Sequence, residues 1–437
     1  MATESDNGKS DDKSPVPGTG SAGQTFLKGE TIYLRALELG DAKHVGAWRR
    51  SIFPIPAEHA EELLKKEVPD QSKGRRWTYV ACRVADDVPV GSLEWGSWDG
   101  RTTDLEVHAP DTLPDAGVVR AEMVRLMVPY LLHEREMMAV YLYGPDHEPE
   151  VAQAAEALGM TFTGRLREAR WVDGERRDEL FWELLHPVWT ERLGAPAPVP
   201  DPDAARPETQ RIVGAKRRPA VSGDPPKNAV MIGERVYLRP YEVEDAEKIA
   251  VWSRQEPETF FDNGRDIRSG IGFAHWIRKL AEDDPQEWVR FAIVLRENDE
   301  LIGGNGLADI DWIHKTAETE TFLDRPEYRG GGLGTEAKHL LLEYAFERLG
   351  LHQVRSFVWD FNTRSAAALR KQGYRDAGGF HWSGIKKAEF AGDVMFDYLA
   401  SEWRAYRDAA VGAEPVAMAA DAPEPSSELV SVAGGEG

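Results

Sequence analysis

The chain has 437 residues, of which 41% are hydrophobic and 29% charged, as expected of a globular protein with two or three domains. Its 53 Lys and Arg face 75 Asp and Glu, which gives a formal net charge of −22. This acidic balance argues against nucleic acid and anionic membranes as partners, because both bind basic surfaces. It mildly favours a cationic substrate, although acidity more often serves solubility alone.

The chain contains one cysteine, Cys82, which excludes an intrachain disulfide and a metal–thiolate cluster. The surrounding sequence YVACRVA is typical of a strand, so we expect a buried, unreactive thiol. The N-terminus has no apolar core for export, and no apolar run is long enough to span a membrane. We therefore expect a cytoplasmic protein that holds no metal, and its oligomeric state stays open.

Three segments are too polar or too rich in proline to build a hydrophobic core. They are residues 1–24, 191–230 and 409–437. We expect both tails to be disordered and the middle segment to be a semi-extended linker. Two globular blocks remain, residues 25–190 and residues 231–408.

The two blocks begin with related sequences, GETIYLRALELGDAKHVGAWRR (29–50) and GERVYLRPYEVEDAEKIAVWSR (233–254). Each predicts a strand, an acidic helix start and an amphipathic helix that carries Trp48 or Trp252. A repeat of this length indicates a duplicated domain rather than a solenoid, whose units are shorter.

The second block mixes predicted helices and strands in the manner of an α/β fold. The predicted helices are 272–284, 335–350 and 362–373. The predicted strands are 289–297, 300–312, 317–324, 352–360, 374–382 and 393–400. Short turns such as that at Asn298 and Asp299 join several strands, so the sheet cannot be wholly parallel.

The sequence RGGGLG, residues 329–334, joins a predicted strand to a predicted helix. Unpaired amides at the helix start and the helix dipole together favour an anion, and glycine lets the backbone approach phosphate oxygens closely. No Gly-Lys-Ser/Thr follows, which excludes a Walker loop, and the spacing does not fit GxGxxG. The loop is therefore predicted to cradle phosphate.

Arg329-x-x-Gly332-x-Gly334 resembles the Arg/Gln-x-x-Gly-x-Gly/Ala signature of the GNAT acetyltransferases. The longer segment AETETFLDRPEYRGGGLGTEA resembles the acyl-CoA-binding region of that superfamily, and FNTRSAAALRKQGY resembles a helix with its Asn-x-x-Ser pattern. The opening VYLRPYEVEDAEKI is similar to the ribosomal-protein N-acetyltransferase-like branch. The resemblance covers residues 233–398.

The first block resembles the same branch only toward its ends, as in GRLREARWVDGERRDELFWELL (164–185). Where the glycine loop belongs, the chain reads APDTLPDAGVVRAEM (109–123), in which Asp111 and Asp115 would repel a pyrophosphate and Pro114 has no amide to donate. The resemblance thus implies two tandem GNAT-like domains, each a mixed, mostly antiparallel sheet flanked by helices. The first would be a degenerate copy, or a remodelled site for another ligand.

The resemblance also implies that acetyl-CoA is the acyl donor, and it indicates which residues would bind the donor. Backbone groups of the strand before the loop would hold the pantetheine arm, namely Phe322, Leu323 and Asp324. The pyrophosphate would lie on Arg329, Gly330, Gly331, Gly332, Leu333, Gly334 and Thr335. Asn362 would contact the CoA arm.

Acyl transfer to an amine requires a neutral amine, a donor for the developing oxyanion and sometimes a proton for the thiolate. Glu318 and Glu320 lie two residues apart on one strand and therefore on one sheet face. Either carboxylate could take a proton or hold a cationic amine there. Asp309 and Asp311 are weaker candidates, since charge on an edge strand explains them equally well.

Many relatives carry Tyr where this chain has Leu369, which cannot donate a proton. Ser365 remains as the nearby hydroxyl, although thiolate could also leave unassisted. Phe260, Phe261 and Trp276 fall in the region that shapes acceptor pockets in the family, and they fit an ordinary core equally well.

His352 and His381 are expected to be structural or solvated.

The sequence predicts an N-acetyltransferase whose second block moves acetyl from acetyl-CoA to a primary amine of a small molecule or a peptide N-terminus. The first block would pack against the second and help to shape the acceptor pocket. A related enzyme that uses another acyl-CoA, and a non-catalytic acyl-CoA sensor or scaffold, are the alternatives.

Overall fold

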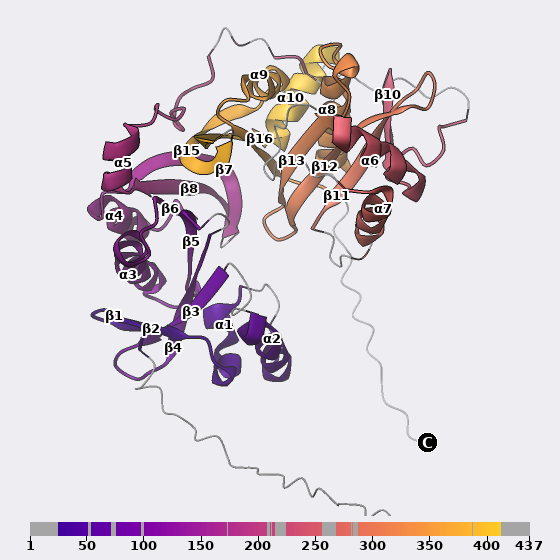
Figure 1. Cartoon of the computed structure of the whole chain (residues 1–437). Helices are drawn as coiled ribbons and strands as arrows, with labels where there is room; N and C mark the ends of the chain where they lie inside the picture. The colour runs from indigo at the N-terminus through magenta and orange to yellow at the C-terminus, as the bar shows by residue number, and fades with distance from the viewer. Residues whose placement is uncertain are drawn as a thin grey trace, which may run out of the picture.

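The two blocks fold into two lobes that share one continuous β-sheet (Figure 1). This computed structural model describes residues 25–411 except residues 51–53, 71–75, 98–99, 173, 208–209, 211, 215–223, 256–267, 281, 283–286 and 387. In this part of the chain the sheet has 16 strands. None of the helices described is long and apolar enough to cross a bilayer.

The first lobe has eight strands and five helices among the described residues. Its strands are β1 (Leu27–Lys28), β2 (Ile32–Ala36), β3 (Arg76–Arg83), β4 (Pro89–Gly96), β5 (Thr102–His108), β6 (Ala139–Pro145), β7 (Thr161–Val172) and β8 (Glu175–Leu185). Its helices are α1 (Val45–Trp48), α2 (Ala57–Asp70), α3 (Ala116–Pro129), α4 (Pro149–Ala157) and α5 (Pro187–Leu193).

The second lobe, in its described part, repeats this inventory. Its strands are β9 (Met231–Ile232), β10 (Val236–Pro240), β11 (Val289–Leu295), β12 (Leu301–Asp311), β13 (Thr316–Leu323), β14 (Gln353–Trp359), β15 (Arg375–Lys386) and β16 (Glu389–Leu399). Its helices are α6 (Ala246–Gln255), α7 (Gly270–Lys279), α8 (Leu333–Glu343), α9 (Thr363–Gln372) and α10 (Ala400–Val411).

The strand order is β1-β2-β3-β4-β5-β6-β8-β7-β15-β16-β14-β13-β12-β11-β10-β9. From its outer edge inward, each lobe has its strands in chain order, except that the last two are exchanged (β8 before β7, and β16 before β15). The pairs β5–β6 and β13–β14 are parallel, and the other pairs described are antiparallel. The predicted α/β fold with two tandem, mostly antiparallel sheets is therefore confirmed.

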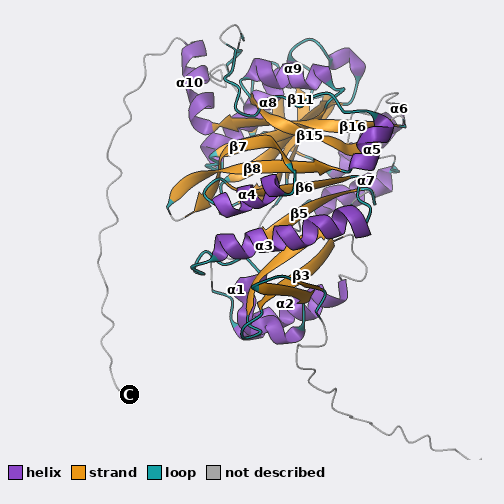
Figure 2. Cartoon of the chain, turned by 90° about the vertical axis from the view of Figure 1, so that its left-hand side faces the viewer, coloured by secondary structure: helices purple, strands orange, loops and turns teal. Residues whose placement is uncertain are grey.

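Helices cover both faces of the shared sheet (Figure 2). In the first lobe α3 and α4 bury one apolar face together with the strands, while α1 and α2 cover the opposite face. In the second lobe α8, α9 and α10 form the larger core, and α6 and α7 pack on the other side. Burial on both faces is clearest at β11, VRFAIVL, where six of the seven residues are buried.

The repeated opening sequence builds the same buried ion pair in each lobe. Arg35 donates to both carboxylate oxygens of Asp41 at 2.9 and 2.6 Å, and Arg239 donates to those of Asp245 at 2.7 and 2.8 Å. Each aspartate also accepts from the amide that begins its helical turn, for example from Glu38 at 2.8 Å. The shared Arg and Asp of the repeat therefore fix the turn from strand to helix.

The lobes join where β7 meets β15, and the residues that pair there are equivalent in the two repeats. Gly164 is the register partner of Gly378. A Cβ on Gly378 would collide with the carbonyl oxygen of Thr163, and φ of Gly378 is +108°, a conformation that favours glycine. Glycine at both positions lets the two backbones approach closely enough to continue the sheet.

A buried charge network crosses the same junction. Arg167 of β7 binds Asp397 and Glu402 of the second lobe, with closest distances of 2.8 Å to each carboxylate. Asp397 is fully buried and also pairs with Arg375 at 2.7 Å. One carboxylate thus holds a guanidinium from each lobe.

Both histidines predicted to be structural or solvated lie at this junction. His352 Nε2 is 2.6 Å from Glu168 of the first lobe, and His381 binds Glu183 through Nδ1 and through its amide. Burial alone would lower the pKa of His381, but the hydrogen bond and charge of Glu183 raise it. Both residues therefore join the lobes.

The described part of the linker packs against the second lobe rather than spanning free space. Arg206 donates to the carbonyl of Gly373 at 2.7 Å, and the amide of Val213 donates to the carbonyl of Lys371 at 2.8 Å.

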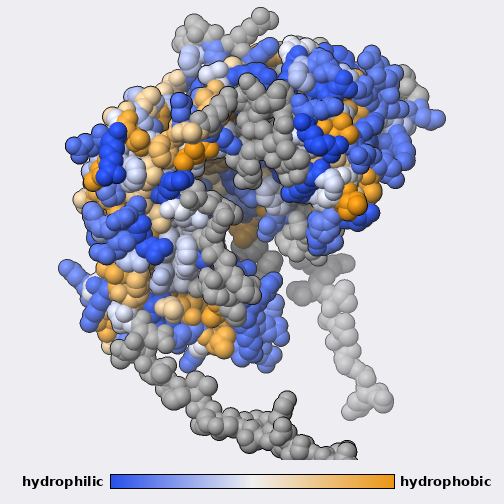
Figure 3. Space-filling view, viewed as in Figure 1, coloured by the Kyte–Doolittle hydropathy of each residue, from blue (hydrophilic) through white to orange (hydrophobic). Residues whose placement is uncertain are grey.

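The sequence analysis did not include α10 among the predicted helices, although its Trp403 is fully buried. On the face seen in Figure 3, hydrophilic residues cover much of the second lobe and apolar residues form separate patches. The predicted N-terminal tail lies outside the described residues, and so does the predicted C-terminal tail except for residues 409–411, which belong to α10.

Candidate active site

In the second lobe β13 and β14 separate part-way along their length. Their parallel register ends at the pair Glu318 and Arg355, although β13 runs on to Leu323 and β14 to Trp359. Beyond that pair β14 keeps its antiparallel partner β16 on the other side. The two strands therefore form a V-shaped opening with Thr319 at its apex.

Alternation along β13 decides which backbone groups face this opening. The amide of Asp324 donates to the carbonyl of Ile302 in β12 at 3.0 Å, so it is not available to a ligand in the opening. Because bonded and non-bonded pairs alternate in an antiparallel ladder, Phe322 also faces β12, whereas Thr321 and Leu323 face β14. The predicted contacts of Phe322 and Asp324 are therefore corrected to Thr321, which sequence reasoning missed, while Leu323 remains a candidate.

The glycine loop follows β13 and leads directly into α8. φ is +82° at Gly330 and +84° at Gly332, the residue that precedes α8. A Cβ on Gly330 or Gly331 would meet no atom within 4 Å, so that side of the loop is open. The first amides of α8 have no acceptor within the helix and point out of its N-terminus. The loop therefore presents open N–H donors beside the positive end of a helix dipole.

Two arginines shape this loop. The guanidinium of Arg329 donates to the carbonyl of Leu323 at 2.8 and 3.1 Å and so ties the loop to β13. Arg235, which the sequence analysis did not single out, donates to the carbonyl of Gly331 at 2.8 Å. Its Nη2 lies 3.3 Å from the position a Cβ would take on Gly332. Arg235 also pairs with Glu336 at 3.0 Å, so its guanidinium is held at the edge of the loop.

α9 starts across the opening from the loop. The side-chain oxygen of Asn362 accepts from the amide of Ser365 at 3.2 Å and caps the helix. This cap fixes the carboxamide where the sequence predicted a contact with the CoA arm. Leu369 is 4% exposed and packs in the core, so the usual acid of this helix is absent here. Ser365 is half-buried in the first turn.

Glu318 and Glu320 are both half-buried, and their alternation places them on one face of β13 as predicted. Glu320 forms an ion pair with Arg290, a residue of β11 that the sequence analysis missed. The guanidinium of Arg290 lies 5.0 Å from the ring centroid of Trp288. The carboxylate of Glu320 is therefore already oriented by a neighbouring cation.

The same face carries a partly buried phenol. Gly304 of β12 leaves room for Tyr241, whose hydroxyl would collide with any Cβ at that position. Tyr241 packs edge to face against Trp276 with 5.4 Å between the ring centroids, and burial raises its pKa well above the usual value. Trp276 thus lies next to the predicted acceptor side. Phe260 and Phe261 lie outside the described residues.

A buried polar cluster surrounds the apex of the opening. The hydroxyl of Tyr374 lies 2.8 Å from Oγ1 of Thr319. Lys338 of α8 is 4% exposed, and its Nζ lies 6.0 Å from the centroid of the Tyr374 ring. Burial lowers the pKa of Lys338 to about 7 and raises that of Tyr374. The sequence analysis gave no role to Lys338 or Tyr374.

The first lobe allows a residue-by-residue comparison. Glu122 of α3 accepts from the amide of Thr31, as Glu336 of α8 accepts from the amide of Arg235. These equivalent contacts align the two helices. In this alignment the first lobe has Arg120 at the position that Gly334 occupies in the second lobe, and Glu148 at the position of Asn362.

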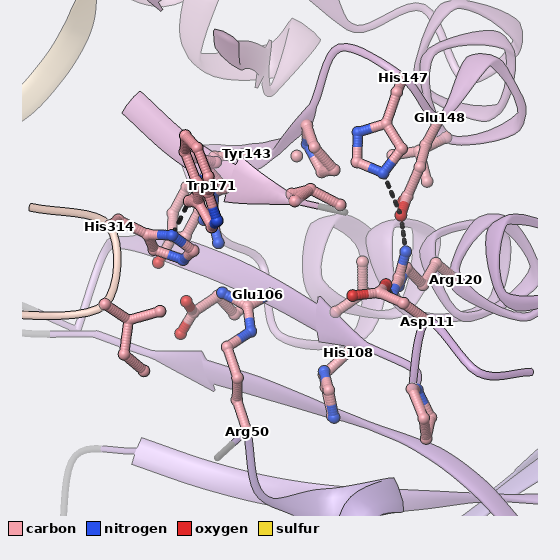
Figure 4. A pocket seen from close by; sticks show the side chains of 18 of the residues that line it. Arg50, Glu106, His108, Asp111, Arg120, Tyr143, His147, Glu148, Trp171 and His314 are labelled. Atoms are coloured by element: carbon pink, nitrogen blue, oxygen red, sulfur yellow. Dashed lines mark hydrogen bonds and ion pairs between the residues drawn. The ribbon is translucent and has the colours of Figure 1, made fainter. Parts of the chain in front are cut away.

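Arg120 and Glu148 form a buried ion pair in the first lobe, with side chains 7% and 6% exposed (Figure 4). Arg120 also binds Asp111 at 2.6 Å. The guanidinium therefore lies beside α3 where the second lobe keeps an open glycine loop. Asp111, which was expected to repel a pyrophosphate, is thus paired with a cation, and a degenerate first copy stays a prediction.

The polar apex is missing from the first lobe as well. In the alignment above, apolar residues replace Thr319, Lys338 and Tyr374; these are Leu105, Val124 and Met160. Among the residues described, both the open glycine loop and the polar apex thus occur in the second lobe alone.

The remaining candidates have structural roles. Asp311 caps the turn after β12 by accepting from the amides of Ile313 and His314 at 2.9 and 2.7 Å. Asp309 is exposed in a bulge of β12, which lies between β11 and β13, so the expectation of an edge strand was wrong. Cys82 is fully buried in β3, as predicted.

Comparison with known proteins agrees with this geometry. Residues 235–375 match the family described as "Acetyltransferase (GNAT) domain". The chain is 31% identical over 156 residues to the probable N-acetyltransferase YjcK of Bacillus subtilis, which covers 33% of this chain and 83% of YjcK. Spermidine N(1)-acetyltransferase of Escherichia coli is 34% identical over 68 residues, covering 16% of this chain and 36% of that protein.

Among solved structures, spermidine N-acetyltransferase from Vibrio cholerae aligns with 21% identity and a TM-score of 0.34, covering 38% of this chain and 95% of that one. The match to YjcK over most of the length of YjcK, together with the family match in the second lobe, shows which family the chain comes from. The chain belongs to the GNAT family of acetyltransferases.

Proposed function

We propose that the second lobe transfers an acetyl group from acetyl-CoA to a primary amine. The observation that carries this proposal is the open glycine loop at the N-terminus of α8, directly beside the opening between β13 and β14. The loop amides and Arg235 would hold the diphosphate of the donor. The backbone of Thr321 and Leu323 would bind its pantetheine arm, which brings the thioester to Thr319.

The acceptor would enter from the face of β13 that carries Glu318 and Glu320. Both carboxylates could attract a protonated amine, and either could remove its proton directly or through water before attack. The net charge of −22 and the similarity to a spermidine acetyltransferase both favour a cationic small amine, such as a polyamine. A peptide N-terminus remains the alternative acceptor within this proposal.

The hydroxyl of Thr319 would donate a hydrogen bond to the leaving thiolate, which would then take its proton from water. Burial raises the pKa of Tyr374, so this phenol stays protonated, and its hydroxyl lies 2.8 Å from Oγ1 of Thr319, where it can orient that group. This pair would stabilise the thiolate where Leu369 cannot act. We propose it in place of Ser365, which lies in the capping turn of α9.

The test combines CoA binding with an acceptor screen. Calorimetry should detect one CoA site on the full chain, and acetyl-CoA should release free thiol with a panel of polyamines, amino acids and peptides, with mass spectrometry of the product. Gly332→Asp should abolish CoA binding, because it places a carboxylate at the diphosphate and a side chain at a positive φ.

The matched control is Val118→Asp, the same charge change at the equivalent position of the first lobe. Val118 is exposed, so this variant should bind CoA normally. Loss of binding only in Val118→Asp would contradict the proposal. CoA binding without thiol release from any amine would leave the lobe as a sensor and refute the enzymatic assignment to it.

A further inference from the structure

A cavity of about 330 Å³ lies in the first lobe where β5 and β6 part (Figure 4). The parallel register of these strands ends at the pair Leu105 and Leu142. The end of β7 forms part of its wall, and so do Ile313 and His314 from the turn between β12 and β13. Both lobes therefore line the cavity, at the place that corresponds to the donor opening of the second lobe.

The cavity differs from the open donor site of the second lobe. The side chains of Arg120, Asp111 and Glu148 occupy the region beside α3 that would receive the diphosphate. What remains is a space suited to a small polar molecule.

Two histidines direct unpartnered ring nitrogens to the cavity wall. His314 is 8% exposed, and its Nδ1 accepts from the amide of Trp171 at 3.0 Å, so Nε2 carries the hydrogen. His108 donates from Nε2 to the carbonyl of Gly46 at 2.9 Å, so Nδ1 is an acceptor. Within the described residues neither His314 Nε2 nor His108 Nδ1 has a hydrogen-bond partner.

The arginines described along the cavity wall differ in their partners. Arg170 pairs with Glu179. Arg50 lies close to Glu106 in Figure 4 but forms no ion pair that the described part of the chain shows. Burial, together with the positive charges of Arg50 and Arg120, lowers the pKa of His108 to about 4, so this ring is neutral near pH 7.

We propose that this cavity binds a small carboxylic acid that also carries a hydroxyl or amino group. The guanidinium of Arg50 and the Nε2 hydrogen of His314 donate to the carboxylate. Nδ1 of His108 and the carboxylate of Glu106 accept from the hydroxyl or amino group. Such a bifunctional ligand would use both the donors and the acceptors of the cavity. A simple anion would use the donors alone and leave the acceptors without a hydrogen-bond partner.

Because His314 belongs to the second lobe, the bound acid touches both lobes. The turn that contains His314 directly precedes β13, the strand that carries Glu318 and Glu320. Binding in the first lobe therefore stabilises the arrangement of the strand on which the acceptor side of the second lobe is built.

The test uses calorimetry on the full chain in the presence of saturating CoA, which occupies the proposed donor site, while the variants below locate the binding of each probe. The probes are lactate, malate, glycine, glutamate, acetate and inorganic phosphate. At least one hydroxy or amino acid should bind with one site per chain and exceed acetate and phosphate in affinity. Arg50→Met and His314→Phe should each weaken its binding at least about tenfold, since each removes one hydrogen-bonding partner of the carboxylate.

Arg83→Met is the matched control, because it removes a guanidinium from the same lobe at an exposed pair with Asp86 outside the cavity. The affinity of Arg83→Met for the acid should equal that of the original chain, and thermal melts should show that all variants are folded. The proposal is overturned if no acid binds, if phosphate or acetate binds best, or if Arg50→Met and His314→Phe both retain full affinity. Gly332→Asp should leave this binding unchanged, so the outcome is independent of the proposed acetyl transfer.

Discussion

Gly164 of β7 and Gly378 of β15 are equivalent residues of two repeats, and they are paired with each other. The same position therefore meets its own counterpart at the junction of the sheet, as an isologous contact does between two identical subunits. Each lobe contributes the same edge, so the junction has the character of a dimer interface formed within one chain.

Gly378→Ala should destabilise the chain through this contact. Two costs add up, the positive φ and the collision of Cβ with the carbonyl of Thr163 and with Cα of Gly164. Together we expect a loss of about 2–4 kcal/mol in the free energy of unfolding, measured with urea. Gly159→Ala is the control, because Gly159 also has a positive φ but a Cβ there meets no atom within 4 Å. Equal losses in both variants would show that close packing at the junction matters little.

Asp397→Asn should be more severe than a loss of surface charge. The carboxylate is fully buried and holds both Arg167 and Arg375, and removing one partner of a buried ion pair leaves the others uncompensated. We expect a loss of about 3–5 kcal/mol in urea unfolding. Glu347→Gln, which breaks the exposed pair with Arg404, should cost less than about 1 kcal/mol. Similar values for the two variants would contradict a central role for Asp397.

Lys338→Met should stabilise the chain in a manner that depends on pH. Between pH 7 and 10.5 the unfolded chain keeps a proton that folded Lys338 has lost, so the free energy of unfolding of the original chain rises with pH in this window. Below pH 7 the full penalty of the buried charge is present, about 5 kcal/mol for a pKa lowered from 10.5 to about 7. The gain from Lys338→Met should therefore be largest at pH 6 and small near pH 10. A gain that does not change with pH would rule out this explanation.

Tyr374→Phe should lower kcat by about 10-fold and change KM little, because it removes the hydroxyl that orients Thr319 toward the leaving thiolate. The rates of acetyl transfer should be measured with acetyl-CoA and the best amine of the screen. Tyr344→Phe serves as the control, since Tyr344 packs on Phe291 of the same lobe away from the apex. An unchanged kcat in Tyr374→Phe would mean that the thiolate leaves without help from this pair of hydroxyls.

Local chemistry was readable from the sequence. The glycine loop before α8, and the strand and acidic helix start of each opening segment, depend on residues close together along the chain. Such features follow from backbone conformation and helix termini, which neighbouring residues determine. For the same reason the strand that carries Glu318 and Glu320 was placed correctly.

Features that depend on distant residues were not predictable in this way. Arg290 meets Glu320 only because β11 pairs with β12 and β12 with β13, and Tyr241 lies over Gly304 for the same reason. The alternation that moves the donor contact from Asp324 to Thr321 needs the register of β12, which periodicity does not supply. Lys338 looked like an ordinary polar residue of a helix, because the sequence does not show that its position is buried.

The join between β7 and β15 has a consequence for how the molecule behaves on dilution. Two separate chains held by these contacts would dissociate as their concentration fell, whereas tethering keeps the partner at a high effective concentration whatever the protein's abundance. A cell that makes very few copies would therefore still obtain every molecule with both lobes assembled. The first lobe, which lacks the glycine loop, is thus always present in a one-to-one ratio with the second lobe. A partner expressed as a separate chain could not guarantee this ratio.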